Sequence, residues 1–316
     1  MTIEPEEITL TCQDGIKLEG LRWRRTNGND RELRFFCLHG WMDNCFTFKN
    51  LANGLLTKLP STVDLDIIAI DLPGHGISSH KSLDGTSTVA GEYVYYMYDA
   101  LQQLQWETET VTAVGHSMGG MIALMFAAAF PLEGLIMIDS LGPMTKSADG
   151  VSKGVRNHIK TRIKGKPPSS VYPDFDTAVE TRCLTAKAFP GNQYISKETA
   201  TELVKRASLI REDGKLEFLH DQRLKWPSML SLTDEHVEQI YRDVAASPAS
   251  SCILLAQDGM PFPPASINRL KELMQPKVVK TLPGSHHFHA DPDSAGSVTD
   301  TIVGFLGVPE KNECFE

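Results

Sequence analysis

Five residues, Gly115–Gly119 with the sequence GHSMG, combine a potential nucleophile with the space that it needs. They follow an apolar, β-rich run at 110–114 and precede a helix-forming run at 121–130. On so sharp a strand-to-helix turn, the flanking glycines keep side chains away from the serine, whose hydroxyl then stands clear of the backbone. The helix N-terminus also favours negative charge on a reacting oxygen. The pattern predicts that Ser117 is the nucleophile of a catalytic site.

A serine nucleophile needs partners elsewhere in the chain. Neutral serine reacts slowly, so a base must lie within hydrogen-bond reach, and an acceptor must orient that base. Histidine suits the first role and a carboxylate suits the second. Of the 10 histidines, three follow a strand-like run at 278–282, and they are His286, His287 and His289. Two aspartates that end other strand-like runs are candidates for the carboxylate.

The elements that would position these groups form a regular alternation. Short runs that are apolar almost throughout predict strands covered on both faces. These runs are residues 33–38, 66–70, 111–114, 135–138, 252–255 and 278–282. Helix-forming stretches separate them at 46–58, 89–105, 118–130 and 267–274. An opening hairpin is expected at 7–11 and 16–24, and the rest predicts a mostly parallel sheet flanked by helices, with ligands beyond the carboxyl ends of its strands.

The alternation fails between residues 142 and 235. This segment has Lys/Arg-rich helical stretches and several prolines, but no strong strand pattern. An insertion of this size after the sixth strand predicts a mainly helical cap that covers the catalytic groove. A segment that only adds core or mediates oligomerisation is the alternative. We therefore expect a core formed by residues 1–141 and 236–316, with the cap at 142–235.

Composition limits the classes of partner. The 316 residues carry a formal net charge of −9, which argues against nucleic acid or an anionic membrane, since both require a basic face. A small-molecule substrate fits better. The six scattered cysteines lack metal-ligand or redox spacing and are expected to be thiols in a reducing compartment. No signal-peptide pattern or long apolar run is evident, so we expect a cytoplasmic protein without a membrane span, of open oligomeric state.

Three motifs in order carry a resemblance to a known family. They are residues 39–41 (HGW), 71–78 (DLPGHGIS) and 115–119 (GHSMG), which together resemble the α/β-hydrolase superfamily. Residues 38–44 and 283–289 are in addition similar to the subgroup called serine hydrolase-like proteins. The resemblance covers nearly the whole chain. It implies an α/β-hydrolase fold with a cap after strand 6, a Ser–His–acid triad, an oxyanion hole and no cofactor.

The resemblance also narrows the choice of base. In this fold the chain order is serine, acid, histidine. Residues 283–286 (PGSH) match the family's motif around its catalytic histidine, which points to His286. His287 is the main alternative, and His289 falls in the loop before the last helix.

For the acid, two positions stay open. Asp258 follows the run at 252–255, the seventh strand of the family, and is preferred because that position is the commoner one. Asp139 follows the run at 135–138, a position that some relatives use instead. The chain departs slightly from the family pattern, because Asp258 lacks the glycine that usually precedes the acid by two or three residues.

The oxyanion hole is expected from two backbone N–H groups, those of Met118 after the nucleophile and of Trp41 after the third strand. No metal site is expected. Neighbouring residues are candidates for the substrate pocket or for holding the shape of its loops. They are His39, Gly40, Asp43 and His116.

These residues predict a serine hydrolase that cleaves a small ester, thioester or lactone through an acyl-enzyme. An aspartate nucleophile, as epoxide hydrolases and haloalkane dehalogenases need, is absent at position 117. Two alternatives stay open. One is a hydrolase-fold binding protein or receptor with weak or no turnover, and the other is a C–C bond hydrolase with the same triad, because a fold does not fix the chemistry.

Overall fold

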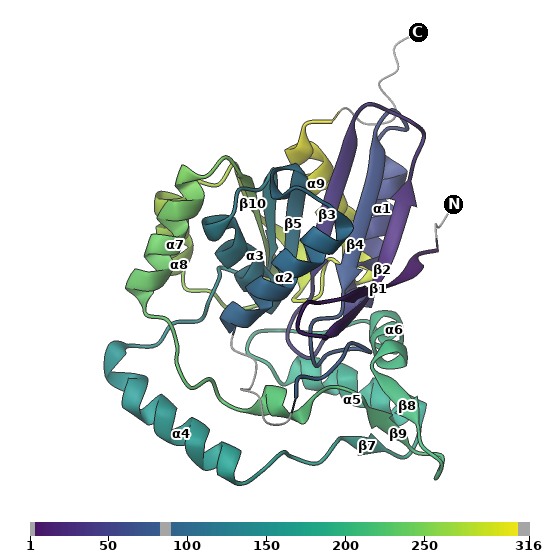
Figure 1. The fold of residues 1–316 in the computed structure, drawn as a ribbon, viewed down its shortest axis with the longest axis vertical. Helices are drawn as coiled ribbons and strands as arrows, with labels where there is room; N and C mark the ends of the chain where they lie inside the picture. Colours follow the sequence, from purple (N-terminus) through teal and green to yellow (C-terminus); the bar gives the residue numbers. More distant parts are fainter. Residues whose placement is uncertain (1–3, 83–89, 309–316) are drawn as a thin grey trace.

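The computed structural model describes residues 4–82 and 90–308. Within this part of the chain the main sheet has the strand order β1-β2-β4-β3-β5-β6-β10-β11 (Figure 1). The strands are β1 (Glu6–Thr11), β2 (Lys17–Arg25), β3 (Glu32–Leu38), β4 (Asp64–Ile70), β5 (Val111–His116), β6 (Gly134–Ile138), β10 (Ser250–Asp258) and β11 (Val278–Ser285). Strands β1 and β2 form the expected antiparallel hairpin, and β2 pairs antiparallel with β4. All other pairs are parallel, which confirms the mostly parallel sheet.

Helices cover both faces of this sheet. Helix α1 (Lys49–Lys58) packs against α9 (Pro292–Leu306) on one face. On the other face lies a layer in which each helix packs against the next; it consists of α2 (Ala90–Leu104), α3 (Met118–Ala129), α7 (Asp234–Ala246) and α8 (Pro264–Met274). In Figure 1, α2 and α3 cross in front of the sheet, and α9 lies behind it.

Complete burial of the central strands explains their apolar sequences. Every residue of β4, β5 and β6 is buried. Side chains on one face of the sheet join a cluster with α2, α3 and α7, and those on the other face join a cluster with α1 and α9. Buried on both faces, a parallel strand has no polar side, so alternation is lost. The carboxyl ends of β3, β5 and β6 then come together at one edge.

The segment between β6 and α7 covers that edge, in the lower part of Figure 1. Its helices are α4 (Val151–Ile163), α5 (Phe175–Lys187) and α6 (Lys197–Arg206). It also contains a small antiparallel sheet of β7 (Val171–Tyr172), β9 (Leu216–Phe218) and β8 (Ser208–Ile210). The sequence shows no strong strand pattern here, because strands of two or three residues are too short to show a period of two.

Two further features bear on the sequence predictions. Among the described residues, no helix has the length and apolar character needed to cross a membrane. The cysteines in the described ranges are free thiols, namely Cys12, Cys37, Cys45, Cys183 and Cys252. Cys314 lies outside the described residues.

Candidate active site

Ser117 occupies a strained turn between β5 and α3. Its φ of 52° and ψ of −114° are rare for a residue with a side chain. The turn is tight: a Cβ on Gly119 would lie 1.9 Å from the Leu38 carbonyl oxygen, and one on Gly115 would lie 2.2 Å from the Gly119 carbonyl oxygen. Both glycines of the GHSMG motif are thus required by backbone contacts. They hold Ser117 half-buried at the end of β5.

Beside this turn, His286 is hydrogen-bonded to Asp139. The His286 Nδ1–H donates to Asp139 Oδ2 at 2.6 Å. The carboxylate is fully buried, whereas the imidazole side chain keeps 12% of its exposure. Because Nδ1 carries the proton, the neutral imidazole has a lone pair at Nε2. His286 can therefore accept a proton on the side away from Asp139.

The backbone at the end of β10 and just beyond it holds the Asp139 carboxylate in place. Ala256 N–H donates to Oδ1 at 3.1 Å, and Met260 N–H donates to Oδ2 at 2.9 Å. Between these donors, Gly259 lies so close that a Cβ there would be 2.3 Å from Asp139 Oδ2. With the His286 bond, three donors converge on one buried carboxylate, which fixes its orientation.

Asp258, the acid that the sequence favoured, does not meet His286. The structure pairs His286 with the alternative, Asp139, and no hydrogen bond joins Asp258 to a described histidine. The register of β10 against β11 shifts between Ala256 and Asp258. The segment around this shift supplies backbone donors to Asp139 instead of a carboxylate to the histidine.

The loop after β3 packs against the serine turn. A Cβ on Gly40 would be 3.3 Å from Ser117 Cβ, so the backbone of residues 40–41 borders the nucleophile. Met118 is the first residue of α3, and its N–H therefore has no acceptor within the helix. No described residue accepts a hydrogen bond from the Trp41 N–H. Both N–H groups thus lack an acceptor among the described residues, as donors of an oxyanion hole would.

The four further pocket candidates, His39, Gly40, Asp43 and His116, are all buried. His39 is fully buried, with Nδ1–H donating to Gly40 O at 2.7 Å and Nε2 accepting from Leu72 N–H at 2.9 Å. Both ring nitrogens are occupied, so His39 has no atom left for a substrate. Asp43 and His116 are 3% and 1% exposed. Such burial fits the expected role of holding the shape of the loops around the serine.

The alternative bases have other partners. His287 Nε2 lies 3.4 Å from Asp43 Oδ2 and 3.3 Å from Arg182 Nη2. His289 Nε2 is hydrogen-bonded to Thr47 Oγ1 at 3.0 Å. Both rings are buried. His286 is thus the member of the terminal histidine group that combines a close carboxylate with partial exposure.

The covering segment reaches the site through contacts that the sequence did not predict. Arg182 of α5 meets His287, and the Trp41 indole donates to Leu224 O at 3.2 Å. Arg206 of α6 is 6% exposed and donates to Asp71 Oδ2 at 2.8 Å. Each contact joins a residue of this segment to a loop at the carboxyl end of a core strand. A buried arginine beside an aspartate distant in sequence gives no local pattern, so sequence reasoning had no means to find it.

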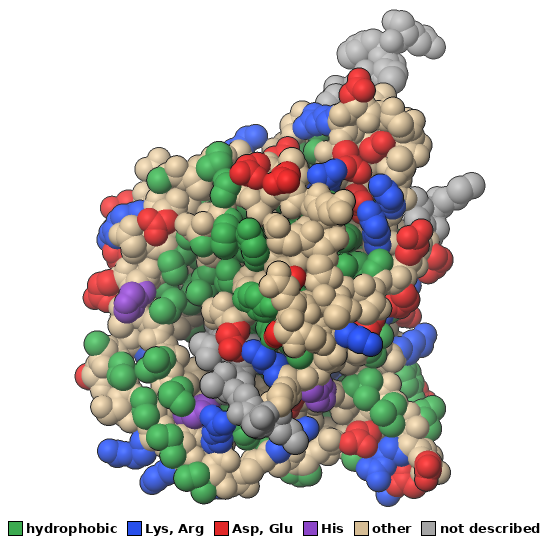
Figure 2. All heavy atoms as spheres, in the orientation of Figure 1, with side chains coloured by type: hydrophobic (Ala, Val, Ile, Leu, Met, Phe, Trp, Pro, Cys, Tyr) green, Lys and Arg blue, Asp and Glu red, His purple; other side chains and the backbone are tan. Residues whose placement is uncertain are grey.

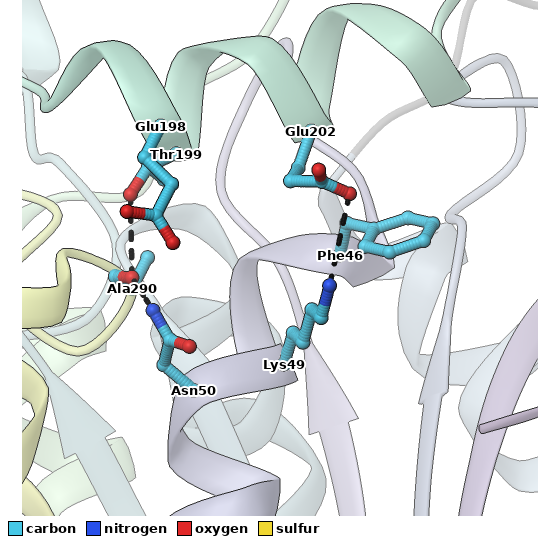
Figure 3. Close-up of a pocket in the computed structure, with 7 residues that line it drawn as sticks. All are labelled: Phe46, Lys49, Asn50, Glu198, Thr199, Glu202 and Ala290. Atoms are coloured by element: carbon cyan, nitrogen blue, oxygen red, sulfur yellow. Dashed lines mark hydrogen bonds and ion pairs between the residues drawn. The ribbon is translucent and has the colours of Figure 1, made fainter. Parts of the chain in front are cut away.

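Two hollows lie elsewhere on the molecule. One, of about 50 Å³, lies between α6 and the start of α1, where Lys49 faces Glu202 and the Asn50 amide donates to Ala290 O at 2.6 Å (Figure 3). The other, of about 500 Å³, borders α4, which carries exposed Ile159. Figure 2 shows apolar side chains gathered along this helix at the lower left. Neither hollow is lined by Ser117 or His286.

Comparison with known proteins decides the family. The family model described as the alpha/beta hydrolase family matches residues 35–298. The chain belongs to this family. A serine hydrolase-like protein of Danio rerio is 30% identical over 92% of this chain and 85% of its own length. The chain is thus an α/β-hydrolase of the serine hydrolase-like subgroup, as the motifs indicated.

Solved structures share the fold of this α/β-hydrolase. A hypothetical protein of Pseudomonas aeruginosa PAO1 has a TM-score of 0.81 and 28% identity, and the match covers 97% of this chain and 100% of that one. A thioesterase domain of the curacin biosynthetic pathway has a TM-score of 0.72 at 20% identity, over 95% of this chain and 99% of that domain. The second likeness concerns the fold alone. The family places the chain among hydrolase-type enzymes that act on small molecules.

Proposed function

We propose that this α/β-hydrolase cleaves a small ester, thioester or lactone through an acyl-enzyme formed on Ser117. The observation that carries the proposal is the 2.6 Å hydrogen bond from His286 Nδ1–H to buried Asp139, beside a serine held at φ 52°. This bond leaves the Nε2 lone pair of a partly exposed imidazole free, and the His286 ring lies 4.5 Å, between centroids, from the ring of His116, the residue before the serine. No side-chain hydrogen bond to a described residue engages the Ser117 hydroxyl, which leaves it available to substrate and base.

In the proposed first step, Ser117 Oγ attacks the carbonyl carbon while His286 Nε2 takes the hydroxyl proton. The imidazolium that forms is stabilised by the Asp139 carboxylate. It then returns the proton to the leaving alcohol or thiol as the tetrahedral intermediate collapses to the acyl-enzyme. A water molecule repeats the sequence on the acyl-enzyme, which releases the acid and restores Ser117.

The negative oxygen of each intermediate would lie between the N–H groups of Trp41 and Met118. These donors are fixed by the backbone, so little reorganisation accompanies the charge that develops there. Removal of one comparable donor in such sites costs about 10²–10³ in rate. The indole contact from Trp41 to Leu224 ties this loop to the covering segment.

The division into a core of residues 1–141 and 236–316 and a cap of 142–235 is part of this proposal. It is supported by the position of α4, α5 and α6 at the edge where Ser117 lies, and by α7, which packs with the core helices α3 and α8. A cytoplasmic location stays a prediction, and the unpaired cysteines, typical of a reducing compartment, support it.

Labelling with a fluorophosphonate tests the nucleophile. The wild-type chain should gain one adduct on the peptide that contains Ser117, seen by mass spectrometry, and Ser117→Ala should gain none. Because the side chain is half-buried, Ser117→Ala should unfold at nearly the same temperature as the wild type. A wild type that stays unlabelled under conditions that label a control hydrolase would favour the binding-protein alternative. Labelling without turnover of p-nitrophenyl esters, but with cleavage of a C–C substrate, would favour the C–C hydrolase.

A further inference from the structure

A second group of chemically active side chains lies beneath the serine turn. One possible ligand atom from each of Asp43, His116 and His287 lies within 4.8 Å of the other two. Asp43 Oδ2 is 3.8 Å from His116 Nδ1 and 3.4 Å from His287 Nε2. Asp43 and His116 side chains are 1% exposed, and that of His287 is 9% exposed. They come from the loop after β3, the end of β5 and the loop after β11, so only the folded chain brings them together.

The hydrogen bond made by His116 Nε2 fixes which ring nitrogen of His116 carries the lone pair. His116 Nε2–H donates to the His286 carbonyl oxygen at 2.9 Å, so Nδ1 of the neutral ring carries a lone pair. Burial lowers the pKa of His116 well below its usual range, and the neighbouring imidazoles lower it further. Nδ1 has no hydrogen-bond partner among the described residues, and Asp43 Oδ2, 3.8 Å away, has none either. Two buried acceptors therefore face each other without a donor between them.

His287 adds a third possible ligand atom. Its Nε2 lies 3.4 Å from Asp43 Oδ2 and 3.3 Å from Arg182 Nη2, and burial lowers the pKa of its imidazole. Burial raises the pKa of Asp43, but the His287 imidazole and the Arg182 guanidinium outweigh burial and hold that pKa below its usual range. The group is thus a buried carboxylate with two neutral imidazoles turned toward it. The unpaired acceptors His116 Nδ1 and Asp43 Oδ2 are costly unless a proton donor or a cation lies between them.

We propose that Asp43, His116 and His287 bind a single divalent transition-metal ion, with Zn²⁺ as the best match. Two neutral imidazoles and one carboxylate are a ligand set that Zn²⁺ accepts, with a fourth position left for water. Ligand atoms about 2.0–2.1 Å from Zn²⁺ in tetrahedral geometry are about 3.3 Å apart. The Asp43–His287 pair, at 3.4 Å, already has this spacing, and the Asp43–His116 pair, at 3.8 Å, is close to it.

Arg182 of α5 competes for the same place. Its guanidinium brings a positive charge to the Asp43 carboxylate, and its Nη2 lies 3.3 Å from His287 Nε2, the nitrogen that would bind the metal. Metal binding therefore displaces this contact between α5 and the core. Removal of the Arg182 charge should strengthen metal binding, whereas removal of Asp43 should weaken it, and these opposite signs are specific to this site.

Calorimetric titration of the chelator-treated full chain with Zn²⁺ tests the site without any substrate. The wild type should bind one equivalent, and the Co²⁺ form should show the visible absorption of a tetrahedral complex. Asp43→Asn and His287→Gln should each weaken binding by more than about tenfold, since even loss of an outer-shell contact costs about 10–100-fold. Arg182→Gln should tighten it.

His289→Gln is the matched control, because His289 is buried beside these rings but its Nε2 pairs with Thr47. It should bind Zn²⁺ like the wild type. Asp43→Asn should fold, since the introduced amide can donate to His116 Nδ1. Absence of stoichiometric binding to the wild type would overturn the proposal, and so would unchanged affinity in Asp43→Asn or weaker affinity in Arg182→Gln. Zn²⁺ binding by a chain that no fluorophosphonate labels would uphold the site while refuting the proposed function.

Discussion

Two carboxylate–histidine groups lie on either side of the serine turn, and they differ in how well they are paired. Asp139 accepts from His286, Ala256 and Met260, so both of its oxygens are satisfied. Asp43 accepts from the Asn44 N–H through Oδ1, but its buried Oδ2 has no hydrogen-bond partner among the described residues. Both groups contain an aspartate and histidine at similar burial, but only the Asp139 carboxylate has a hydrogen-bond partner at each of its oxygens.

The difference shows what each group is suited to do. A fully paired carboxylate holds one tautomer of its histidine, which is what proton transfer by a base requires. An incompletely paired carboxylate beside two imidazoles offers ligand atoms to a cation, which is what a metal site requires. Aspartate-to-asparagine substitutions at the two positions therefore provide the sharpest test of the comparison.

The largest effect is expected from Asp139→Asn. The amide would favour the wrong imidazole tautomer of His286 and would not stabilise the imidazolium, so kcat on an activated ester should fall by about 10⁴-fold. Asp258→Asn, at the acid that sequence favoured, should change kcat by much less. Both variants should unfold near the wild-type temperature if Asp139 acts in turnover and not only in folding. A larger loss in Asp258→Asn would return the role of acid to Asp258.

Much of this arrangement could be predicted from sequence. The buried strands are apolar throughout because both of their faces are covered, and Ser117 stands out because two glycines flank it within five residues. The choice between Asp139 and Asp258 was beyond sequence, because it depends on a register shift in β10 after Ala256. The contact of Arg182 with His287 joins residues 105 positions apart. The periodicity of a sequence does not reveal contacts between residues so far apart.

A smaller loss is expected from Gly259→Ala. The added Cβ would meet Asp139 Oδ2 at 2.3 Å and Ala256 Cβ at 2.7 Å, so the carboxylate must move from His286. A displacement of about 1 Å in such a site costs about 10²-fold in rate. Gly304→Ala in α9 is the control, since its Cβ meets nothing within 4 Å. Equal kcat for the two variants would show that the backbone after β10 does not position Asp139.

Acid should destabilise the fold through another buried pair, the imidazoles of His39 and His75, whose centroids are 5.0 Å apart. Burial lowers the pKa of both from 6.5, that of His75 the further. The unfolded chain therefore takes up protons first as the pH falls. Stability is complete above pH 6.5 and should decrease below it, by about 1.4 kcal/mol per pH unit for each group.

Urea unfolding at several pH values measures this slope. His75→Asn removes one titrating group while its amide can still donate to Pro73 O, as His75 does at 3.2 Å. The variant should therefore lose less stability than the wild type between pH 7 and pH 5, by about 1.4 kcal/mol per unit at most. A steeper loss in His75→Asn would mean that the imidazole is charged in the folded chain.

The smallest effect is expected from Asp43→Asn in the metal-free chain. The new amide keeps an oxygen for the Asn44 N–H and offers an N–H to His116 Nδ1, but the variant loses the attraction between the Asp43 charge and Arg182. These two changes oppose each other, so the free energy of unfolding should change by no more than about 1 kcal/mol. Urea denaturation without and with Zn²⁺ then separates the two groups. The metal should stabilise the wild type and leave Asp43→Asn unchanged, and equal stabilisation of both chains by Zn²⁺ would show that Asp43 does not bind the metal.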